Sequence, residues 1–361
     1  MIIYFILLLF LLSNISNNKK KSFAILSFTL FLIGFLRTDS VGTDVKSYCN
    51  LFDGIAADFF HIDSLQLMYS DIEFGFIFLI KAIKHIFDDS MTIVRVLFLL
   101  SFASLYYCIL NLSTKPILTL FIYYSLSFYF FSFNGIRQAF AISLSLLVIT
   151  IFLKHKLSLR NAIISSLWIL IIAFFFHKSL VVSIIVPFIL KYTHSKFLSN
   201  NKLVLTLIVS LLASIFLSSL LVRAISMLDI SFMGSDKYSS YLETVTVQES
   251  FSYFSNTLHA LFAIFLLYTT HKRNPWLQIY AIGTLILVLL SPLSWLFIRV
   301  SDNLKIYIIL ALPFIWQEWK NSKNSVMYQT ITIFYCLVLF VNRIMDDNFK
   351  DVVPYVCEIF K

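Results

Sequence analysis

The sequence predicts an all-α, polytopic integral membrane protein with about 12 transmembrane helices. Three observations lead to this class. The chain has 361 residues, of which 59% are hydrophobic and only 13% are charged, whereas a soluble domain carries about 25% charged residues. Its mean hydropathy is +0.87. Apolar runs long enough to form buried helices also follow one another through the whole chain. Together these observations exclude a soluble enzyme.

Twelve apolar runs are separated by polar residues. A helix that crosses the hydrocarbon core needs about 20 residues, with a range of about 17–25. The runs lie near 1–15, 22–36, 91–110, 116–133, 137–153, 161–176, 179–192, 203–222, 254–270, 275–291, 303–316 and 326–342. The first run lacks a basic stretch before it and a small-residue cleavage site after it, so we expect a retained helix. The prediction is one membrane domain over 1–361, with outer segments near 37–90 and 223–253.

Basic residues cluster between alternate apolar runs, and this pattern predicts the orientation. The clustered residues are Lys19, Lys20, Lys21, Lys115, Lys154, Lys156, Arg160, Lys191, Lys196, Lys202, Lys272, Arg273, Lys320 and Lys323. Basic loops are retained on the cytoplasmic side, so we expect both termini outside. The net charge of +9 then reflects topology, and it does not indicate a nucleic-acid partner.

Residues 72–87 form an apolar stretch that we expect to lie in the outer interface. A crossing there would invert every later loop. Lys81, Lys84, His85 and Asp88 follow one another at helical spacing on one face. An interfacial helix satisfies both observations. The alternative is a thirteenth transmembrane helix.

The cysteine and glycine patterns exclude several kinds of site. The four cysteines, Cys49, Cys108, Cys336 and Cys357, form no CxxC pair, so neither a zinc site nor a disulfide framework is indicated. No glycine-rich phosphate loop is present among the 7 glycines. We assign no cofactor and no metal.

The first outer segment opens with charged residues directly after an apolar run. Arg37, Asp39 and Asp44 lie within eight residues, and Gly42 permits a turn with positive φ. The arginine suits a diphosphate, and a carboxylate suits a proton from a sugar hydroxyl. The alternative is a solvated loop with Arg37 snorkelling from a helix end.

Two further charged residues lie at predicted helix starts. Glu73 opens the interfacial helix, where a carboxylate is favoured by the helix dipole alone. Arg137 is a cation in a first helical turn, which the dipole disfavours, and apolar runs flank it. Asn134 can cap that helix. We therefore expect Arg137 to have an anionic ligand or a neighbouring carboxylate.

Two more polar breaks complete the set. His177, Lys178 and Ser179 form a tight turn between two runs, where His177 suits acid or base chemistry and Lys178 suits a phosphate. A plain polar turn is the alternative. Arg299 precedes Asp302 by three residues, so it suits either a ligand or a simple pair with that carboxylate.

The predicted topology places all five groups at the outer face. The cytoplasmic breaks carry mainly basic residues, amides and Glu318. We therefore expect a site that acts on a lipid-linked or exported substrate presented at the outer leaflet.

Taken in order, these residues resemble those of the EpsG family of bacterial polysaccharide polymerases, relatives of the Wzy O-antigen polymerases. The resemblance runs from about residue 25 to 320 and rests on an ordered set of motifs. These are Arg37-x-Asp39-x-x-Gly42-x-Asp44-x-x-x-Tyr48, Glu73-x-Gly75, Asn134-x-x-Arg137-Gln138-x-x-Ala141 and His177-Lys178-Ser179.

The resemblance implies an enzyme of the bacterial cytoplasmic membrane that polymerises repeat units carried on undecaprenyl diphosphate at the outer face. The product would be capsule, O-antigen or exopolysaccharide, and a flippase and a chain-length regulator would be partners. A hydroxyl attacks the anomeric carbon and the lipid diphosphate leaves, which requires a base and cations. The expected base is His177, Asp39, Asp44 or Glu73, with His177 first. The expected diphosphate-binding cations are Arg37, Arg137, Lys178 and Arg299.

Three alternatives remain open from the residues. A flippase of the same lipid-linked unit would bury charges along a path through the membrane, whereas these charges lie at the ends of the runs. A glycan acyltransferase would use His177 but would also need a donor site on the cytoplasmic side. The third alternative is a non-enzymatic scaffold.

Overall fold

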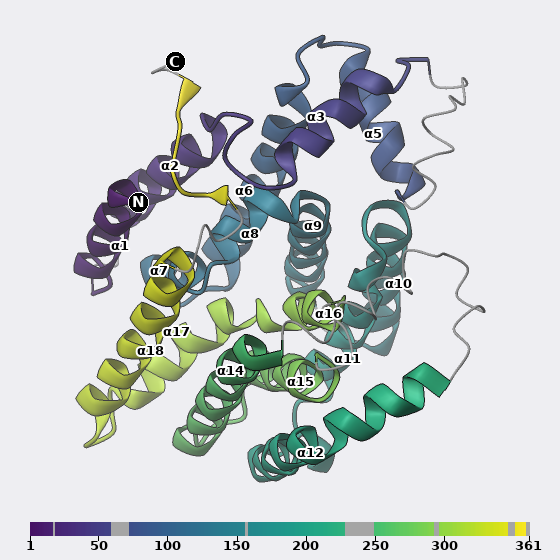
Figure 1. Cartoon of the computed structure of the whole chain (residues 1–361). Coiled ribbons are helices and arrows are strands. Elements are labelled where there is room, and N and C mark those ends of the chain that lie inside the picture. Colours follow the sequence, from purple (N-terminus) through teal and green to yellow (C-terminus); the bar gives the residue numbers. More distant parts are fainter. Residues whose placement is uncertain are drawn as a thin grey trace. The chain divides into compact units, whose positions relative to one another are not determined.

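The computed structural model describes residues 1–16, 19–58, 72–155, 158–227, 249–291, 296–345 and 351–358, with the side chains of 215–227 and 249–253 excepted. Its regular elements are helices (Figure 1), and Arg37 forms an isolated antiparallel bridge with Cys357. The all-α prediction is confirmed. The chain divides into two compact units. Unit 1 comprises Met1–Pro187 and Val326–Lys361, and unit 2 comprises Phe188–Ser325.

Unit 1 contains the N-terminal helices together with the last one. Its helices are α1 (Ile2–Ser13), α2 (Lys20–Phe35), α3 (Val45–Gly54), α5 (Phe74–Lys84), α6 (Met91–Leu112), α7 (Pro116–Ser125), α8 (Phe128–Asn134), α9 (Ile136–Leu153), α10 (Leu159–Phe176), the 3-10 helix η1 (Lys178–Ile185) and α18 (Ser325–Met345). α9 packs against α6, α8 and α10, and α5 packs against α3, α6 and α10. The ends of α3, α5, α9 and α10 are thereby brought to one region.

The run at 116–133 is not one straight helix, contrary to the prediction. α7 and α8 meet at a bend of 55°, because Ser127 adopts a left-handed conformation with φ of 66°. The Tyr129 hydroxyl donates to the Leu30 carbonyl at 2.7 Å and holds α8 against α2. The broken helix places Asn134 and the start of α9 at the end of unit 1 where the loop after α2 lies.

The run at 179–192 also differs from the expected continuous α-helix. It forms η1 followed by α11 (Val186–Lys191). A 3-10 helix rises about 2.0 Å per residue, so the eight residues of η1 cover about 16 Å. The Ser166 hydroxyl donates to the Ile184 carbonyl at 2.8 Å and holds η1 alongside α10. The tighter helix returns the chain along α10 directly after the turn at His177.

α5 is a short amphipathic helix. Its 11 residues extend about 17 Å, roughly half of the hydrocarbon thickness, which favours the interfacial prediction over a thirteenth crossing. Phe74 and Phe78 are 62% and 53% exposed on one side of it. Further along the helix, Lys81 donates to the Asp58 carbonyl at 2.9 Å, and Lys84 donates to the carbonyls of Phe52 and Asp53 at 2.7 and 2.8 Å. The basic face therefore binds the end of α3 and its following residues.

The C-terminal strap, residues 351–358, lies across the loop that joins α2 to α3. Thr38 N donates to the Val356 carbonyl at 3.1 Å, and Gly42 N donates to the Asp351 carbonyl at 2.9 Å. The hydroxyl of Tyr4, near the start of α1, donates to the Val352 carbonyl at 2.8 Å. The two ends of unit 1 therefore meet beside this loop.

Unit 2 consists mainly of four further helices around a central one. Its elements are η2 (Lys196–Leu198), α12 (Asn200–Met227), α14 (Glu249–Thr269), α15 (Pro275–Leu290), α16 (Leu296–Lys305) and α17 (Ile308–Trp319), preceded by most of α11. α15 packs against α12, α14, α16 and α17. Asn274 caps α15 by accepting the N–H groups of Trp276 and Leu277 at 2.9 and 3.2 Å. The run expected at 303–316 is divided, because the chain breaks after Lys305 and α17 begins at Ile308.

Four described helices are long and apolar enough to cross a membrane, or five if α7 and α8 form one crossing; the four are α6, α9, α10 and α18. Shorter apolar stretches lie in α1, α12, α14, α15 and α17. The chain is thus a helical membrane protein, and the count of about 12 crossings stays a prediction. Most of the expected outer segment at 223–253 lies outside the described residues.

Candidate functional site

The ion pair between Glu73 and Arg137 is the centre of the site. The two residues are 64 positions apart in the chain, at the start of α5 and in the first turn of α9. Glu73 Oε2 contacts Arg137 Nη1, and the two side chains are 6% and 20% exposed. Arg137 therefore has the anionic neighbour that its unfavourable place in the helix dipole requires.

Tyr48 and Phe76 complete the surroundings of the Arg137 guanidinium. Arg137 Nε donates to the Tyr48 hydroxyl at 3.3 Å, and the guanidinium carbon lies 5.6 Å from the Phe76 ring centre. A guanidinium has five N–H donors, and these two polar contacts with described residues occupy one at Nε and one at Nη1. The Nη2 edge of this partly exposed cation is suited to an anionic oxygen.

The second oxygen of Glu73 joins the ion pair to the end of α10. Glu73 Oε1 accepts the backbone N–H of Lys178 at 3.1 Å. Gly75 permits the close approach that this bond needs, since a Cβ there would lie 2.6 Å from the Phe175 Cβ and 2.7 Å from the Phe175 carbonyl oxygen. The two residues of the Glu73-x-Gly75 pattern therefore act together. Gly75 allows α5 to approach Phe175 closely, and the Glu73 carboxylate then accepts the Lys178 N–H.

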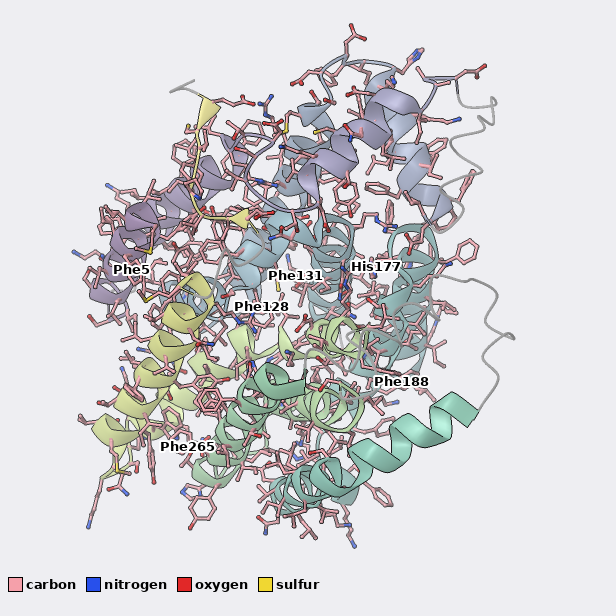
Figure 2. The ribbon with its side chains drawn as sticks, in the orientation of Figure 1. Phe5, Phe128, Phe131, His177, Phe188 and Phe265 are labelled. Carbon is pink, nitrogen blue, oxygen red and sulfur yellow. The ribbon has the colours of Figure 1, made fainter. Side chains whose placement is uncertain are left out.

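His177, which is labelled in Figure 2, caps the C-terminal end of α10 and directly precedes Lys178. Its Nδ1 is 2.8 Å from the Ser179 hydroxyl. When Nδ1–H donates to Ser179, the Nε2 atom carries the lone pair that accepts a proton. His177 is half-buried, and Glu73 fixes the backbone of the adjacent residue. The backbone beside His177 is thus bound by Glu73, and its imidazole contacts Ser179.

Asn134 attaches the loop after α2 to the start of α9. Its Oδ1 accepts both the backbone N–H of Thr43 at 2.7 Å and the Thr43 hydroxyl at 2.9 Å. Gly42, with φ of +114°, lies against the Phe133 carbonyl, which a Cβ would approach to 2.6 Å. The predicted turn at Gly42 is present. It lets the loop contact the α8–α9 junction, and Asn134 binds this loop in addition to its place at a helix end.

The two aspartates of this loop have different places. Asp44 is half-buried, immediately precedes α3, and acts electrostatically on Arg137. Asp39 is also half-buried and acts electrostatically on Cys49 of α3. Asp44 therefore belongs with Tyr48 and Arg137, and it is the loop carboxylate that we associate with the ion pair.

Arg37 is enclosed and supports the loop. Its side chain is 1% exposed, and Nη1 donates to the Gly34 carbonyl at the end of α2. The guanidinium carbon lies 4.3 Å from the Phe133 ring centre and 5.1 Å from that of Phe98. Burial lowers the pKa of Arg37 to about 10. Arg37 is enclosed by the strap and the aromatic rings, and its expected role as a diphosphate-binding cation stays a prediction.

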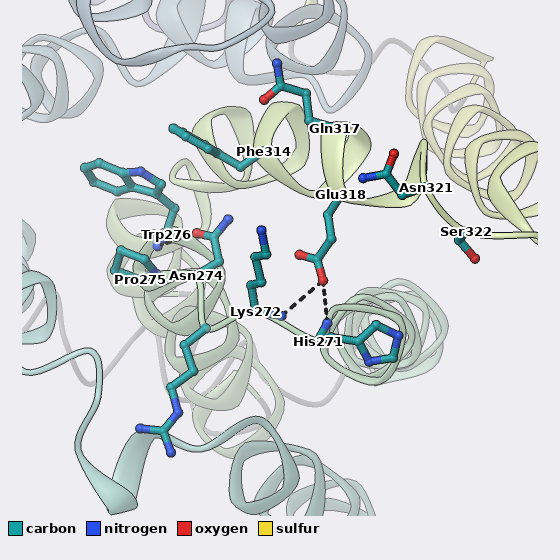
Figure 3. A pocket seen from close by; sticks show the side chains of 11 residues that line it. His271, Lys272, Asn274, Pro275, Trp276, Phe314, Gln317, Glu318, Asn321 and Ser322 are labelled. Carbon is teal, nitrogen blue, oxygen red and sulfur yellow. Dashed lines mark hydrogen bonds between the residues drawn. The ribbon is translucent and has the colours of Figure 1, made fainter.

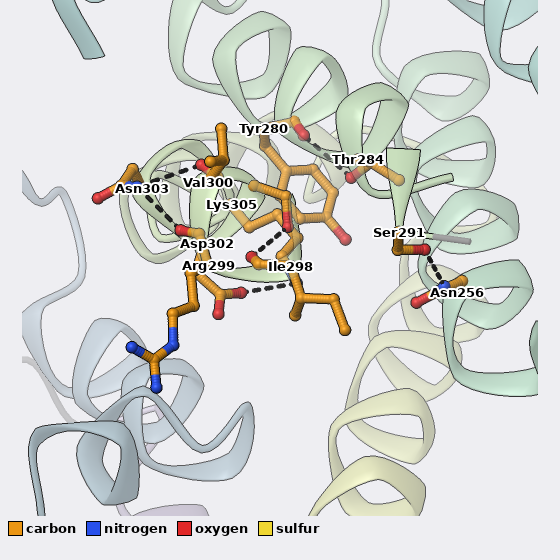
Figure 4. A network of polar contacts seen from close by, with 11 residues as sticks. Asn256, Tyr280, Thr284, Ser291, Ile298, Arg299, Val300, Asp302, Asn303 and Lys305 are labelled. Carbon is orange, nitrogen blue, oxygen red and sulfur yellow. Dashed lines mark hydrogen bonds and ion pairs between the residues drawn. The ribbon is translucent and has the colours of Figure 1, made fainter. Parts of the chain in front are cut away.

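Lys178 and Arg299 have separate places. The Lys178 side chain is exposed, although its backbone N–H is bound by Glu73. Arg299 belongs to unit 2, where it lies in α16. Asp302, the expected alternative partner of Arg299, pairs with Lys305 at 2.8 Å, and Figure 4 shows the Arg299 guanidinium pointing away from that pair.

A comparison with protein families matches residues 20–357, nearly the whole chain, to the EpsG family. The chain belongs to the EpsG family. The resemblance stated from the ordered motifs is thereby confirmed, and this EpsG-family protein is a membrane protein of polysaccharide biosynthesis. Comparison with the curated proteins and with the solved structures gives no match.

Three contacts of the site were not predicted from the sequence. They are the Glu73 bond to Lys178 N, the Tyr48 bond to Arg137 and the Thr43 bonds to Asn134. Tyr48 and Asn134 were recognised as parts of motifs, but their partners lie 89 and 91 positions away. The ordered spacing was the available signal, and it named the residues without pairing them.

Proposed function

We propose that this EpsG-family protein polymerises oligosaccharide repeat units carried on undecaprenyl diphosphate. The observation that carries the proposal is the Glu73–Arg137 ion pair with its bond to Lys178 N, which joins the ends of α5, α9 and α10 into one polar group. Ionisable residues within apolar helices are costly and mark functional sites. The residues around the pair supply the two groups that the transfer requires, a cation and a base.

The reaction forms one glycosidic bond and breaks one anomeric carbon–oxygen bond. A hydroxyl of one lipid-linked unit attacks the anomeric carbon at the reducing end of the growing chain. The electron pair of the breaking bond leaves with the lipid diphosphate, and the hydroxyl proton passes to a base. Arg137 and the exposed Lys178 would bind the leaving diphosphate.

We assign the base to His177. The Ser179 contact at 2.8 Å orients the ring and presents Nε2 to the hydroxyl. Asp44 is the second candidate, since it acts on the same guanidinium. Glu73 is less suited, because both of its oxygens are engaged and its charge is matched by Arg137. We place the site at the outer face of the cytoplasmic membrane, with a flippase and a chain-length regulator as partners.

A deletion strain tests the proposal through its lipid-linked glycans. A polymerase leaves single repeat units that accumulate on the outer side of the membrane. Accumulation on the inner side would indicate a flippase and would contradict the proposal. Full-length polymer that lacks only an acyl group would indicate an acyltransferase. Restored polymer length from a plasmid copy, but not from Arg137→Gln at equal protein level, would tie the activity to the site described above.

A further inference from the structure

A pocket of about 810 Å³ lies in unit 2, where the loop between α14 and α15 faces the end of α17. Its lining combines cations, amides and aromatic rings. The residues are His271, Lys272, Arg273, Asn274, Pro275, Trp276, Phe314, Gln317, Glu318, Asn321 and Ser322. None of them belongs to the site around Arg137.

The pocket lies at the depth of a lipid headgroup. Three apolar helices terminate beside it, since α14 ends at Thr269, α15 begins at Pro275 and α17 ends at Trp319. Aromatic residues mark the same level: Tyr268 is 81% exposed and Phe314 is also exposed at the pocket wall. Aromatic side chains concentrate where the hydrocarbon core meets the headgroups. The pocket therefore opens at the membrane–water boundary.

The charge at this end of unit 2 is strongly positive. Its described cations are Lys191, Lys196, Lys202, Lys272, Arg273, Lys320 and Lys323. Contacts join the three segments that carry most of them: Arg273 Nη1 donates to the Ser195 carbonyl at 3.1 Å, and Asn200 Nδ2 donates to the Thr270 carbonyl at 2.9 Å. This is the predicted cytoplasmic end, and such basic pockets attract anionic lipids.

The acidic residue of the pocket is hydrogen-bonded to the loop between α14 and α15. Glu318 Oε1 accepts the backbone N–H groups of His271 and Lys272 at 2.7 and 3.0 Å. These bonds fix the loop, and in Figure 3 the Lys272 side chain then extends into the pocket between Asn274 and Glu318. In the part of the chain that the structure describes, the Lys272 ammonium makes no hydrogen bond or ion pair. Lys272 is thus a cation presented to an occupant.

We propose that this pocket binds the headgroup of an anionic phospholipid from the surrounding leaflet. The Lys272 ammonium would contact the phosphate. Asn274 and Gln317 present amides to the headgroup hydroxyls, and the exposed Phe314 lies along the first part of an acyl chain. The inference is independent of the proposed polymerase activity, because it concerns other residues and another ligand.

Lipid binding to the purified full-length protein tests this proposal. The protein is held in uncharged detergent micelles, and its thermal unfolding is followed while phosphatidylglycerol, phosphatidylcholine or glycerol 3-phosphate is added. We expect phosphatidylglycerol to raise the Tm in a saturable manner, with no comparable effect of the other two. Lys272→Gln should weaken the apparent affinity by about fivefold, as expected for one cation near an anionic headgroup.

Lys320→Gln is the matched control, since it removes one cation from the same end of unit 2 but does not line the pocket. It should leave the phosphatidylglycerol affinity within about twofold, because surface charge at a distance is screened. Equal stabilisation by phosphatidylcholine would overturn the proposal, as would equal losses in Lys272→Gln and Lys320→Gln. Saturation by glycerol 3-phosphate at the same concentration would assign the pocket to a soluble anion and would overturn the lipid assignment.

Discussion

The carboxylate of Glu73 binds Arg137 through one oxygen and the backbone N–H of Lys178 through the other. One side chain thereby joins the start of α5 to the start of α9, where Arg137 lies 64 positions further along the chain. It also joins α5 to the turn after α10, where Lys178 lies 105 positions further along. Removing one partner of a fully buried ion pair costs about 3–5 kcal/mol, and the partial exposure of Arg137 lowers this cost here. The pair is therefore both a structural link and the charged centre of the proposed site.

Gly75→Ala should move α5 away from α10 and so disrupt the site, although every side chain of the site is retained. A Cβ at this position meets Phe175 at 2.6 Å, so α5 must shift from α10 and the Glu73 bond to Lys178 N is lost. Overpacking of this kind costs about 1–3 kcal/mol. We expect shortened polymer on gels of extracted polysaccharide. Phe78→Ala, on the exposed side of α5, is the control and should retain polymer length, whereas unchanged polymer in Gly75→Ala would argue against this packing.

Ser179→Ala should reduce elongation less than a change at His177. The hydroxyl orients the imidazole through one bond of 2.8 Å, worth about 0.5–1.5 kcal/mol, or about a two- to tenfold rate effect. A general base contributes about 10²–10⁴-fold, which His177→Gln would lose. Elongation rates measured over a range of pH separate the two roles. Near-normal activity of His177→Gln would remove His177 as the base and leave Asp44.

Arg37→Met should change stability and leave substrate affinity unaltered. The guanidinium is buried, and the pKa of about 10 lies below its ordinary 12.5. Below about pH 10 both folded and unfolded chains carry the charge, so its burial cost is constant. Between about pH 10 and 12.5 the unfolded chain binds more protons, and stability rises with pH. Arg37→Met lacks this rise.

Thermal unfolding of both proteins at several pH values from 8 to 11 measures the difference, and the apparent KM for lipid-linked units measures binding. An Arg37→Met protein with normal stability but a much raised KM would support the diphosphate role expected from the sequence. It would also contradict the enclosed position between Phe98 and Phe133.

Chemical labelling of Cys357 tests the orientation of the chain in the membrane. It is the half-exposed cysteine of the four, and the other three are buried; burial also raises the pKa of the Cys49 thiol. A membrane-impermeant maleimide should therefore label Cys357 in spheroplasts. Cys357→Ser should abolish labelling, and Lys272→Cys in that background should be labelled only after permeabilisation. The opposite pattern would invert the predicted topology.

The long helices were predictable because their apolar runs are uninterrupted. The runs at 91–110, 137–153 and 161–176 correspond to Met91–Leu112, Ile136–Leu153 and Leu159–Phe176. The break in the run at 116–133 was not predictable, because Ser127 is neither glycine nor proline. Its left-handed conformation depends on packing around α8. Hydropathy alone also gives no sign that Lys178–Ile185 forms a 3-10 helix.

Within the site, the need of Arg137 for an anionic partner was predictable, but the identity of that partner was not. A cation at an unfavourable dipole position signals a missing anion, but the choice of Glu73 depends on how α5 packs on α10. The enclosed position of Arg37 was harder still to predict from the sequence. Its enclosure depends on the C-terminal strap, where Cys357 pairs with it across 320 positions of the chain, and no local pattern encodes that contact.

The elongation rate of a charge-pair series tests the central claim most directly. Glu73→Gln, Arg137→Gln and the double variant are purified at matched yield and supplied with lipid-linked repeat units. Because the two residues act as one unit, each single variant should lose about 10²-fold or more of the rate, and the double variant should be no slower than the slower single one. Wild-type chain length from either single variant, in folded protein, would contradict the account.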